Sequence, residues 1–289
     1  MLVYFNGQFR PNTEALVSVD DRGFIFGDGV YEVWRVVNGR LFETERHHAR
    51  LARGLRELAI TPPAAARPDV LQEVADRLLA ENDLLEGEAT LYLEITRGGA
   101  PRAHQFPPAD TPPTVYAFVR RLVPPEDVRA RGVSAITVPD VRWMRCDLKT
   151  IQLLPNVLAK QAAAEHDAFE AILVRDGVIT EGSHTSVLAV VDGELRTHPT
   201  NNLILPGVTR AVLLEIAAAA GMPVREEAIT VAELPDAQEL FLAGTTADVM
   251  PIVRVDDETI GAGRPGPIAA RLQRDLRAHM DASCAAVSA

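Results

Sequence analysis

Alternating apolar and polar positions predict strands near the start of the chain, and turn residues divide these strands into hairpins. The apolar runs LVYF and VYEVWRVV are followed by the pairs Asn6-Gly7 and Asn38-Gly39. Asn-Gly between two strand patterns is typical of a two-residue hairpin turn. Helical periodicity covers residues 44–59, with Thr44 as the expected N-cap, and residues 68–82. The runs LYLEITRG and TVYAFVR predict two more strands, so residues 1–119 are expected to form a small α+β domain.

A second pattern begins after residue 119. Segment 120–126 contains Pro124-Pro125 and is expected to be an interdomain linker. Beyond it, GVSAITV predicts a strand, Pro155 opens a helical run, and EAILVR, VITEG, SVLAVV and ELRTH predict a meander. Helices are expected at residues 208–220 and from Pro267 to about 280, with ELFLAGTT and MPIVRV as further strands. Residues 127–289 therefore form the predicted larger, C-terminal domain of an α/β (α+β) protein.

Composition excludes several classes of protein. The chain has 289 residues, 47% of them hydrophobic, and a formal net charge of -11, which argues against non-specific nucleic-acid binding. The start of the chain shows no signal-peptide pattern, and no apolar run is long enough to predict a membrane span. The two cysteines, Cys146 and Cys284, form no disulfide or zinc pattern. We therefore expect a cytoplasmic protein.

Lysine usage draws attention to one stretch. Of the 29 lysines and arginines, only Lys149 and Lys160 are lysines, and both lie close together. Arginine stays protonated, whereas a deprotonated lysine can form a Schiff base. Lys160 lies in an Ala-rich helical run and is interpreted as a solvated helix lysine. Lys149 follows an irregular segment with several cationic residues, so it is a candidate nucleophile, with a purely structural lysine as the open alternative.

Two segments have the residues of an anion site. LPGVTR places Val208 and Thr209 at a predicted helix start, where free backbone N–H groups favour phosphate. LAGTTAD places Thr245 at a strand end. Each is an ordinary helix cap or turn when taken singly, but the pair beside an unusual lysine suggests a phosphorylated cofactor. Arg50 would supply a charged partner, unless it is a solvated helix arginine.

Several other residues are candidates for recognition. Glu181, in VITEGSHTS, would hold a heteroaromatic ring nitrogen protonated, or be an ordinary turn glutamate. Arg102 and His104, in the loop APRAHQF, suit a substrate carboxylate, and the Tyr31 phenol could join them; loop decoration and strand packing are the alternatives. The histidines show no ligand spacing, so no metal is expected.

These residues together resemble the fold-type IV pyridoxal-phosphate transaminases, and within them the D-amino-acid transaminases. The motifs that carry the likeness are spread over nearly the whole chain: DRGFIFGDGVYEV, TRGGAPRAHQF, VRWMRCDLKTIQLL, VITEGSHTSV, LILPGVTR and AGTTAD. The family implies a two-domain fold with a β-barrel-like C-terminal domain. It also implies a homodimer in which the loop with Arg102 and His104 reaches the neighbouring subunit's site.

The resemblance implies roles for the candidate residues. Lys149 would form the Schiff base with pyridoxal 5'-phosphate and act as general base and acid, and Glu181 would pair with the ring nitrogen. Arg50, Val208, Thr209 and Thr245 would hold the phosphate. Tyr31, Arg102 and His104 would bind the substrate carboxylate. The implied reaction is ping-pong transamination between a D-amino acid, such as D-alanine, and a 2-oxo acid, such as 2-oxoglutarate.

Two departures from the family pattern and several alternatives stay open. His184 stands where the family commonly has a hydroxyl, and Gly244 stands where a serine often precedes the two threonines. Only the loop with Arg102 and His104 separates the D-specific reading from transaminases for branched-chain L-amino acids or (R)-amines, and from aminodeoxychorismate lyase. A cofactor-binding protein without turnover is the alternative from a different class.

Overall fold

The computed structural model describes residues 1–285, and its chain divides into two compact units. The first unit consists of residues 1–123, the short segment Leu148–Leu153 and, at the end of the described chain, residues 283–285. The second consists of residues Pro124–Asp147 and Leu154–Ala282. The chain therefore enters the second unit, returns to the first for only six residues around Lys149, and then enters the second again.

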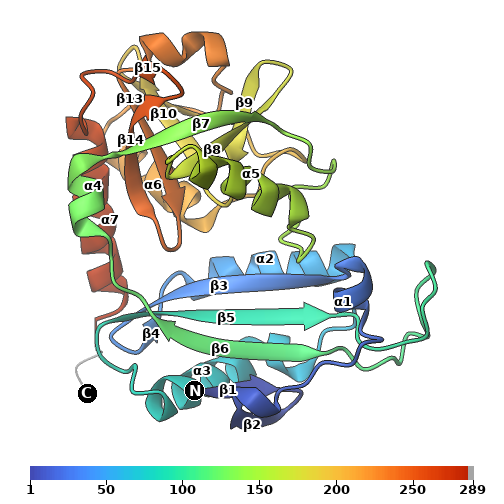
Figure 1. Ribbon diagram of the computed structural model, residues 1–289. Coiled ribbons are helices and arrows are strands. Elements are labelled where there is room, and N and C mark those ends of the chain that lie inside the picture. The colour runs from blue at the N-terminus through green and yellow to red at the C-terminus, as the bar shows by residue number, and fades with distance from the viewer. Residues whose placement is uncertain (286–289) are drawn as a thin grey trace. The chain divides into compact units, whose positions relative to one another are not determined.

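The first unit is built on a six-stranded antiparallel sheet (Figure 1). Its strand order is β2-β1-β6-β5-β3-β4. The strands are β1 (Leu2–Phe5), β2 (Gln8–Pro11), β3 (Gly29–Val37), β4 (Arg40–Leu41), β5 (Glu88–Thr96) and β6 (Val115–Arg121). The helices are α1 (Arg22–Phe26), α2 (Thr44–Glu57) and α3 (Pro68–Glu81), with 3-10 turns at Asn12–Glu14 and Ala64–Ala66. Apolar side chains of α2 and α3 form one core with the strands, including Trp34, Leu55 and Leu78.

Most sequence predictions for this unit are confirmed, including both hairpins. Asn6 and Asn38 take positive φ values of 47° and 46° at the tips of the hairpins, which Asn adopts more readily than most residues. The prediction that Thr44 caps α2 is wrong. Thr44 is the first helical residue, Glu43 precedes it with a φ of 52°, and the Thr44 hydroxyl donates to the carbonyl of Leu41.

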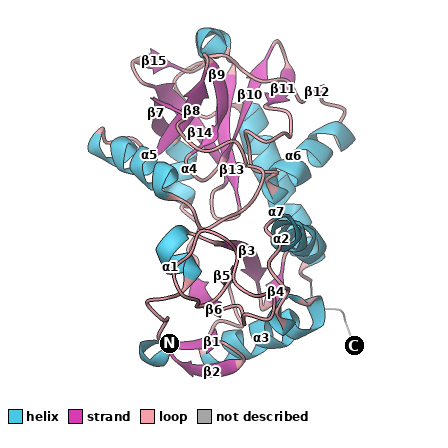
Figure 2. Cartoon of the chain, turned by 90° about the vertical axis from the view of Figure 1, so that its right-hand side faces the viewer, coloured by secondary structure: helices cyan, strands magenta, loops and turns pink. Residues whose placement is uncertain are grey.

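The second unit contains a nine-stranded mixed sheet (Figure 2). Its main path is β12-β11-β10-β13-β14-β7-β8-β9, and β15 pairs with β14. The strands are β7 (Val133–Pro139), β8 (Glu170–Arg175), β9 (Val178–Gly182), β10 (Ser186–Val191), β11 (Glu194–Thr197), β12 (Val224–Arg225), β13 (Glu239–Gly244), β14 (Asp248–Val255) and β15 (Glu258–Thr259). The helices are α4 (Glu126–Arg131), α5 (Leu154–Glu165), α6 (Val208–Ala219) and α7 (Pro267–Ser283), with a 3-10 turn at Val231–Asp236.

The four strands predicted as a meander and their two turns are confirmed, but the meander is wrong: β8 pairs with β9 and β10 with β11, while β10 has β13 and not β9 as its other neighbour. Asp176 and Asp192 have positive φ values at the two hairpin tips, each followed by a glycine that also has positive φ. The segment predicted as a linker, 120–126, has regular structure at both ends, because β6 continues to Arg121 and α4 begins at Glu126. The short helix α4 has no strong periodic pattern, so it was not predicted from the sequence.

Candidate active site

Lys149 is fixed to the sheet of the first unit by backbone pairing. The Tyr31 N–H donates to the Lys149 carbonyl at 3.0 Å, Thr150 forms an isolated bridge with Val30, and the Ile151 N–H donates to the Gly29 carbonyl. Gly29 must be glycine here, because a Cβ atom would lie 2.7 Å from the Ile95 carbonyl oxygen. The start of β3 therefore sets the position of the Lys149 backbone.

The Lys149 amine lies over the ring of Tyr31. Its Nζ atom is 4.2 Å from the ring centroid, within the range of a cation–π contact. The Tyr31 ring also stacks on Tyr92, with centroids 5.6 Å apart. The structure thus brings together the predicted catalytic lysine and one of the three residues predicted to bind substrate.

Arg50 is held by a buried carboxylate that the sequence analysis missed. Its guanidinium donates to both oxygens of Glu32 at 2.9 and 2.7 Å, and His47 Nδ1 lies 3.0 Å from the same carboxylate. Burial alone would raise the pKa of Glu32, but Arg50 and His47 outweigh it and hold that pKa below its ordinary value. Burial lowers the pKa of His47. That Arg50 binds the cofactor phosphate stays a prediction; the structure shows that Glu32 holds its guanidinium in place.

Arg102 and His104 lie together on one exposed loop, and their ring contacts among the described residues are with Phe26, not with Tyr31. The Phe26 ring touches both: the Arg102 guanidinium carbon is 5.4 Å from its centroid, and the His104 ring centroid is 5.7 Å away. Both side chains are exposed. The structure therefore supports a paired guanidinium and imidazole but shows no contact of either with Lys149 among the described residues.

Glu181 is a buried acid of the second unit. Its carboxylate accepts hydrogen bonds from the Arg142 guanidinium and from the Leu205 N–H, the latter at 3.1 Å. Burial raises the pKa of Glu181 to about 7, even though Arg142 pulls it down. Arg142 also donates hydrogen bonds from Nε and Nη2 to the two carboxylate oxygens of Asp140, at 2.9 Å each. A carboxyl group with this pKa gains or loses its proton near neutral pH, as groups at functional sites often do.

The two segments predicted to bind an anion meet at the same turn of the second unit. Antiparallel pairing of β10 with β13 places Ser186 opposite Ala243. As a result, Gly244 lies against Thr185, which a Cβ atom on Gly244 would approach to 3.5 Å. A Cβ atom on Gly207 would lie 2.8 Å from the Ser186 hydroxyl oxygen. The start of α6 and the threonine turn therefore flank residues 185 and 186.

The start of α6 has the features of an anion site. Gly207 is its N-cap and provides no side-chain hydrogen bond to the first turn, while Val208 and Thr209 are buried. Uncapped N–H groups and the helix dipole favour a negative charge at such an end. Leu205, which donates to Glu181, lies just before this turn. One short segment therefore contacts the buried acid and begins the helix.

One of the two departures from the family pattern, His184, lies against a second buried carboxylate, Glu170. It accepts from the Ser183 and Thr185 hydroxyls and lies 3.1 Å from His184 Nδ1. Lys160, expected to be solvated, is half-buried; its amine donates to the Phe169 carbonyl and lies 3.8 Å from Glu170. Lys160 is a helix lysine as expected, and its side chain is 41% exposed, so it is solvated as well as bonded to the protein. Gly244 leaves open the space next to Thr185.

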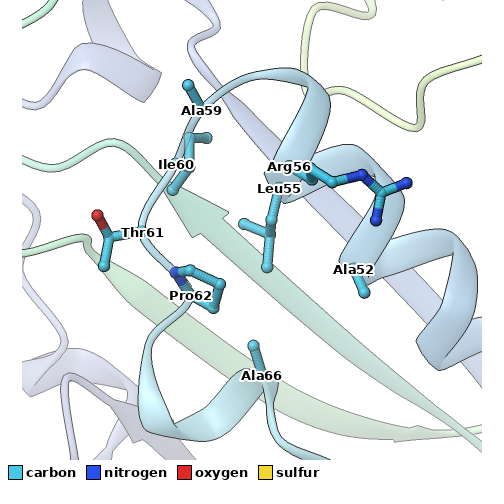
Figure 3. Close-up of a pocket in the computed structure, with 8 residues that line it drawn as sticks. All are labelled: Ala52, Leu55, Arg56, Ala59, Ile60, Thr61, Pro62 and Ala66. Carbon is cyan, nitrogen blue, oxygen red and sulfur yellow. The ribbon is translucent and has the colours of Figure 1, made fainter.

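A hollow of about 420 Å³ lies in the first unit, at the end of α2 (Figure 3). It is lined by mainly apolar residues: Ala52, Leu55, Arg56, Ala59, Ile60, Thr61, Pro62 and Ala66. None of the predicted site residues lines it. Within residues 1–285, no helix has the length and apolarity to cross a membrane, and no cluster of three or more metal-ligating side chains occurs.

Comparison with known proteins decides the family. Residues 29–255 match the model of the amino-transferase class IV family. The chain belongs to the class IV aminotransferases. It is 43% identical over 279 residues to the D-alanine aminotransferase of Bacillus licheniformis, covering 96% of each chain. The family and fold class expected from the sequence are thus confirmed.

Solved structures agree with this class IV assignment. The branched-chain amino acid aminotransferase of Escherichia coli superposes with a TM-score of 0.87 at 25% identity, over 96% of this chain and 94% of that one. A hypothetical aminotransferase from Mycobacterium tuberculosis, in its PLP-bound form, gives a TM-score of 0.83 at 26% identity, over 98% and 100% of the two chains. The class IV fold therefore extends over nearly the whole chain.

Sequence reasoning missed three polar residues of this aminotransferase: Glu32 and Arg142, which contact the candidate site residues Arg50 and Glu181, and Glu170, which contacts the departure His184. Glu32 had a signal: it is the one acid at an inward position of β3, between the buried residues Val30 and Trp34. Arg142 was noted only as a cation near Lys149, and its pairing with Glu181 joins residues 39 positions apart. Glu170 opens a strand and gave no sequence signal.

Proposed function

We propose that this chain is a pyridoxal-phosphate-dependent transaminase of D-amino acids, which passes the amino group to a 2-oxo acid in a ping-pong cycle. The observation that carries the proposal is the Lys149 amine, which lies 4.2 Å from the Tyr31 ring centroid on a segment pinned to β3. The 43% identity to a D-alanine aminotransferase supports the D-amino-acid substrate.

The residues present fit this cofactor. Its phosphate matches the uncapped start of α6 with buried Val208 and Thr209, flanked by Thr245. Its ring nitrogen matches Glu181, a buried acid with a pKa of about 7 that Arg142 holds in place. We infer that Lys149 would hold this cofactor covalently and that Arg50 would contribute to binding its phosphate.

The chain's residues would divide the work of the reaction. The cofactor supplies an electron sink for the bond that breaks at the substrate Cα. Lys149 would hold the cofactor covalently, and as a free amine its Nζ would take the substrate Cα proton and return it as general acid. Glu181 keeps the proton on the ring nitrogen. Tyr31 limits the positions open to Nζ by packing beneath it.

Substrate orientation would come from Arg102 and His104, which bind the α-carboxylate together with Tyr31. Both are exposed in the single chain, which supports a homodimer in which this loop serves the neighbouring subunit's site. Exposed apolar side chains along α5, at Leu154, Val157 and Leu158, also support self-association. The low cysteine content of the chain, two residues in 289, supports the proposed cytoplasmic location.

Visible absorption of the purified protein tests the substrate class. We expect the band of the lysine-bound cofactor to be lost when D-alanine is added without a 2-oxo acid, and to persist with L-leucine. Loss with L-leucine alone would favour a branched-chain L-transaminase, the activity of the Escherichia coli structure. No response to either, with the band present, would favour (R)-amines or the lyase reaction. No band after adding the cofactor would refute the cofactor assignment.

Mixing two impaired variants, assayed at a D-alanine concentration well below the raised KM of Arg102→Ala, tests the shared dimer site. Lys149→Ala and Arg102→Ala homodimers should each be impaired. After subunit exchange, a mixed dimer has one site with the native Lys149 of one chain and the native Arg102 of the other. Random exchange should restore about a quarter of wild-type activity if the loop acts in the partner's site. No recovery, with mixed dimers demonstrated by tagged subunits, would place Arg102 in its own chain's site.

A further inference from the structure

The loop that carries Arg102 and His104 needs an anchor. It connects β5 and β6 over residues 97–114 and contains no helix or strand. An irregular loop of this length is mobile unless side chains fix it. Exact placement of a guanidinium and an imidazole on such a loop therefore depends on contacts elsewhere in the first unit.

Arg22 of α1 supplies the direct anchor. Its Nη1 donates to the carbonyls of Ala103, at 2.7 Å, and Gln105, at 3.4 Å. These two carbonyls stand on either side of His104. Phe26, one turn further along α1, packs against both Arg102 and His104. The Arg22 guanidinium thus ties the loop backbone to α1 at the site residues.

Asp28 fixes the position of Arg22. Its Oδ2 accepts from Arg22 Nε and from Arg97 Nε, both at 2.8 Å, and its Oδ1 accepts from Arg97 Nη2 at 2.9 Å. The side chains of both arginines are buried, and that of Asp28 is only 11% exposed. Arg97 begins the loop and is itself tied to α2 by bonds to the Leu58 and Ala59 carbonyls.

Charge makes this carboxylate hard to replace. Two guanidinium groups with restricted access to water share one aspartate, so neutralising it leaves two cations facing each other. Burial would raise the pKa of Asp28, but the hydrogen bonds and charges of Arg97 and Arg22 outweigh it and keep that pKa below its ordinary value. The aspartate therefore stays ionised at every pH at which the enzyme would work.

We propose that Asp28 is the positioning residue of the carboxylate-binding loop, residues 97–114. Through Arg22 it fixes the backbone on both sides of His104, so that Arg102 and His104 are placed to bind the substrate carboxylate. The inference rests on the proposed function of Arg102 and His104. It predicts that Asp28 affects binding of carboxylates and leaves the chemistry at Lys149 unchanged, since Asp28 contacts neither the lysine segment nor Tyr31 among the described hydrogen bonds.

The test compares Asp28→Asn with Arg102→Ala in the cofactor-loaded enzyme. We expect Asp28→Asn to raise KM for D-alanine and the inhibition constant of propionate by about 10- to 100-fold, as a displacement of about 1 Å can do. Hydroxylamine attacks the lysine-bound cofactor without needing a carboxylate site, so its rate of bleaching the visible band should change less than about twofold. Asp110→Asn, an exposed aspartate on the same loop, is the matched control and should change neither constant.

The outcomes separate the two proposals. If Arg102→Ala raises KM for D-alanine and Asp28→Asn does not, the positioning role is wrong while the proposed function stands. If neither variant changes KM or propionate binding, the carboxylate site itself is wrong. If Asp28→Asn also alters the hydroxylamine rate or the cofactor band, its effect is a general structural one and the positioning role is refuted. A melting temperature for each variant confirms that the compared proteins are folded.

Discussion

Glu181 should make the cofactor-free protein lose stability as the pH rises. Its pKa is raised to about 7 in the folded chain from an ordinary value of 4.5. A carboxyl whose folded pKa lies above its unfolded pKa binds more protons when folded. Its contribution to stability is therefore full below pH 4.5 and is lost as the pH rises to about 7.

The size of the loss follows from the two pKa values. The difference between about 7 and 4.5, at about 1.36 kcal/mol for each pKa unit, amounts to about 3 kcal/mol. Between pH 5.5 and 8.5 about 2 kcal/mol of this should be lost, with the curve flat above about pH 7.5. Glu181→Gln has nearly the same shape and cannot ionise, so the variant should lack this part of the slope.

Urea unfolding of the cofactor-free protein at several pH values measures this difference. The free energy of unfolding of Glu181→Gln minus that of the wild type should grow by about 2 kcal/mol from pH 5.5 to 8.5. Other titrating groups cancel in this difference because both proteins have them. Parallel curves would refute the argument that burial dominates the environment of Glu181. In the cofactor-loaded wild type the slope should largely disappear, because a protonated ring nitrogen would then pair with the carboxylate.

Three further predictions test other residues. Lys149→Ala should abolish turnover and the lysine-bound absorption band while the circular dichroism spectrum stays unchanged; substantial turnover would refute its role. Asp248→Asn removes the charge that Arg129 contacts at 2.6 Å, while asparagine tolerates the φ of 52° at this position. The turn that contains Thr245 should then loosen, and cofactor affinity, measured by fluorescence titration, should fall by about tenfold. Unchanged affinity would show that the Arg129–Asp248 pair does not support the phosphate site. Arg102→Ala should raise KM for D-alanine with little change in kcat, measured by coupled assay, and an unchanged KM would remove it from the site.

Local patterns predicted the elements because each depends on neighbours in the chain. The Asn-Gly hairpins, the helices of the first unit and the Asp-Gly turns follow from backbone preferences and periodicity that a few residues determine. The failed N-cap at Thr44 shows the limit: the chain enters α2 through Glu43 in a left-handed conformation, and the hydroxyl is then directed to Leu41. Tertiary context decided which of two neighbouring residues begins the helix.

The site could be predicted only as separate parts. The sequence identified Lys149 by rarity and Thr209 by its helix start, but the pairing of β10 with β13 was needed to bring the threonine turn beside residues 185 and 186. Ion pairs such as Arg142 with Glu181 join residues that the chain separates by 39 positions. No local rule specifies such a partner, because the choice depends on which strands become neighbours.

The excess of arginine over lysine in this chain is related to its buried acids and to the role proposed for Lys149. Glu32, Asp28 and Glu181 each lie against at least one arginine fork, and a fork satisfies two carboxylate oxygens at once without losing its proton. A lysine in such a place would offer a single point charge whose pKa shifts on burial. Because arginines hold the structural carboxylates, a deprotonated amine is needed only at Lys149. Replacing one of these buried arginines by lysine would keep the positive charge but lose the paired hydrogen bonds to the carboxylate, so it would disturb the site more than a charge-conserving substitution is expected to.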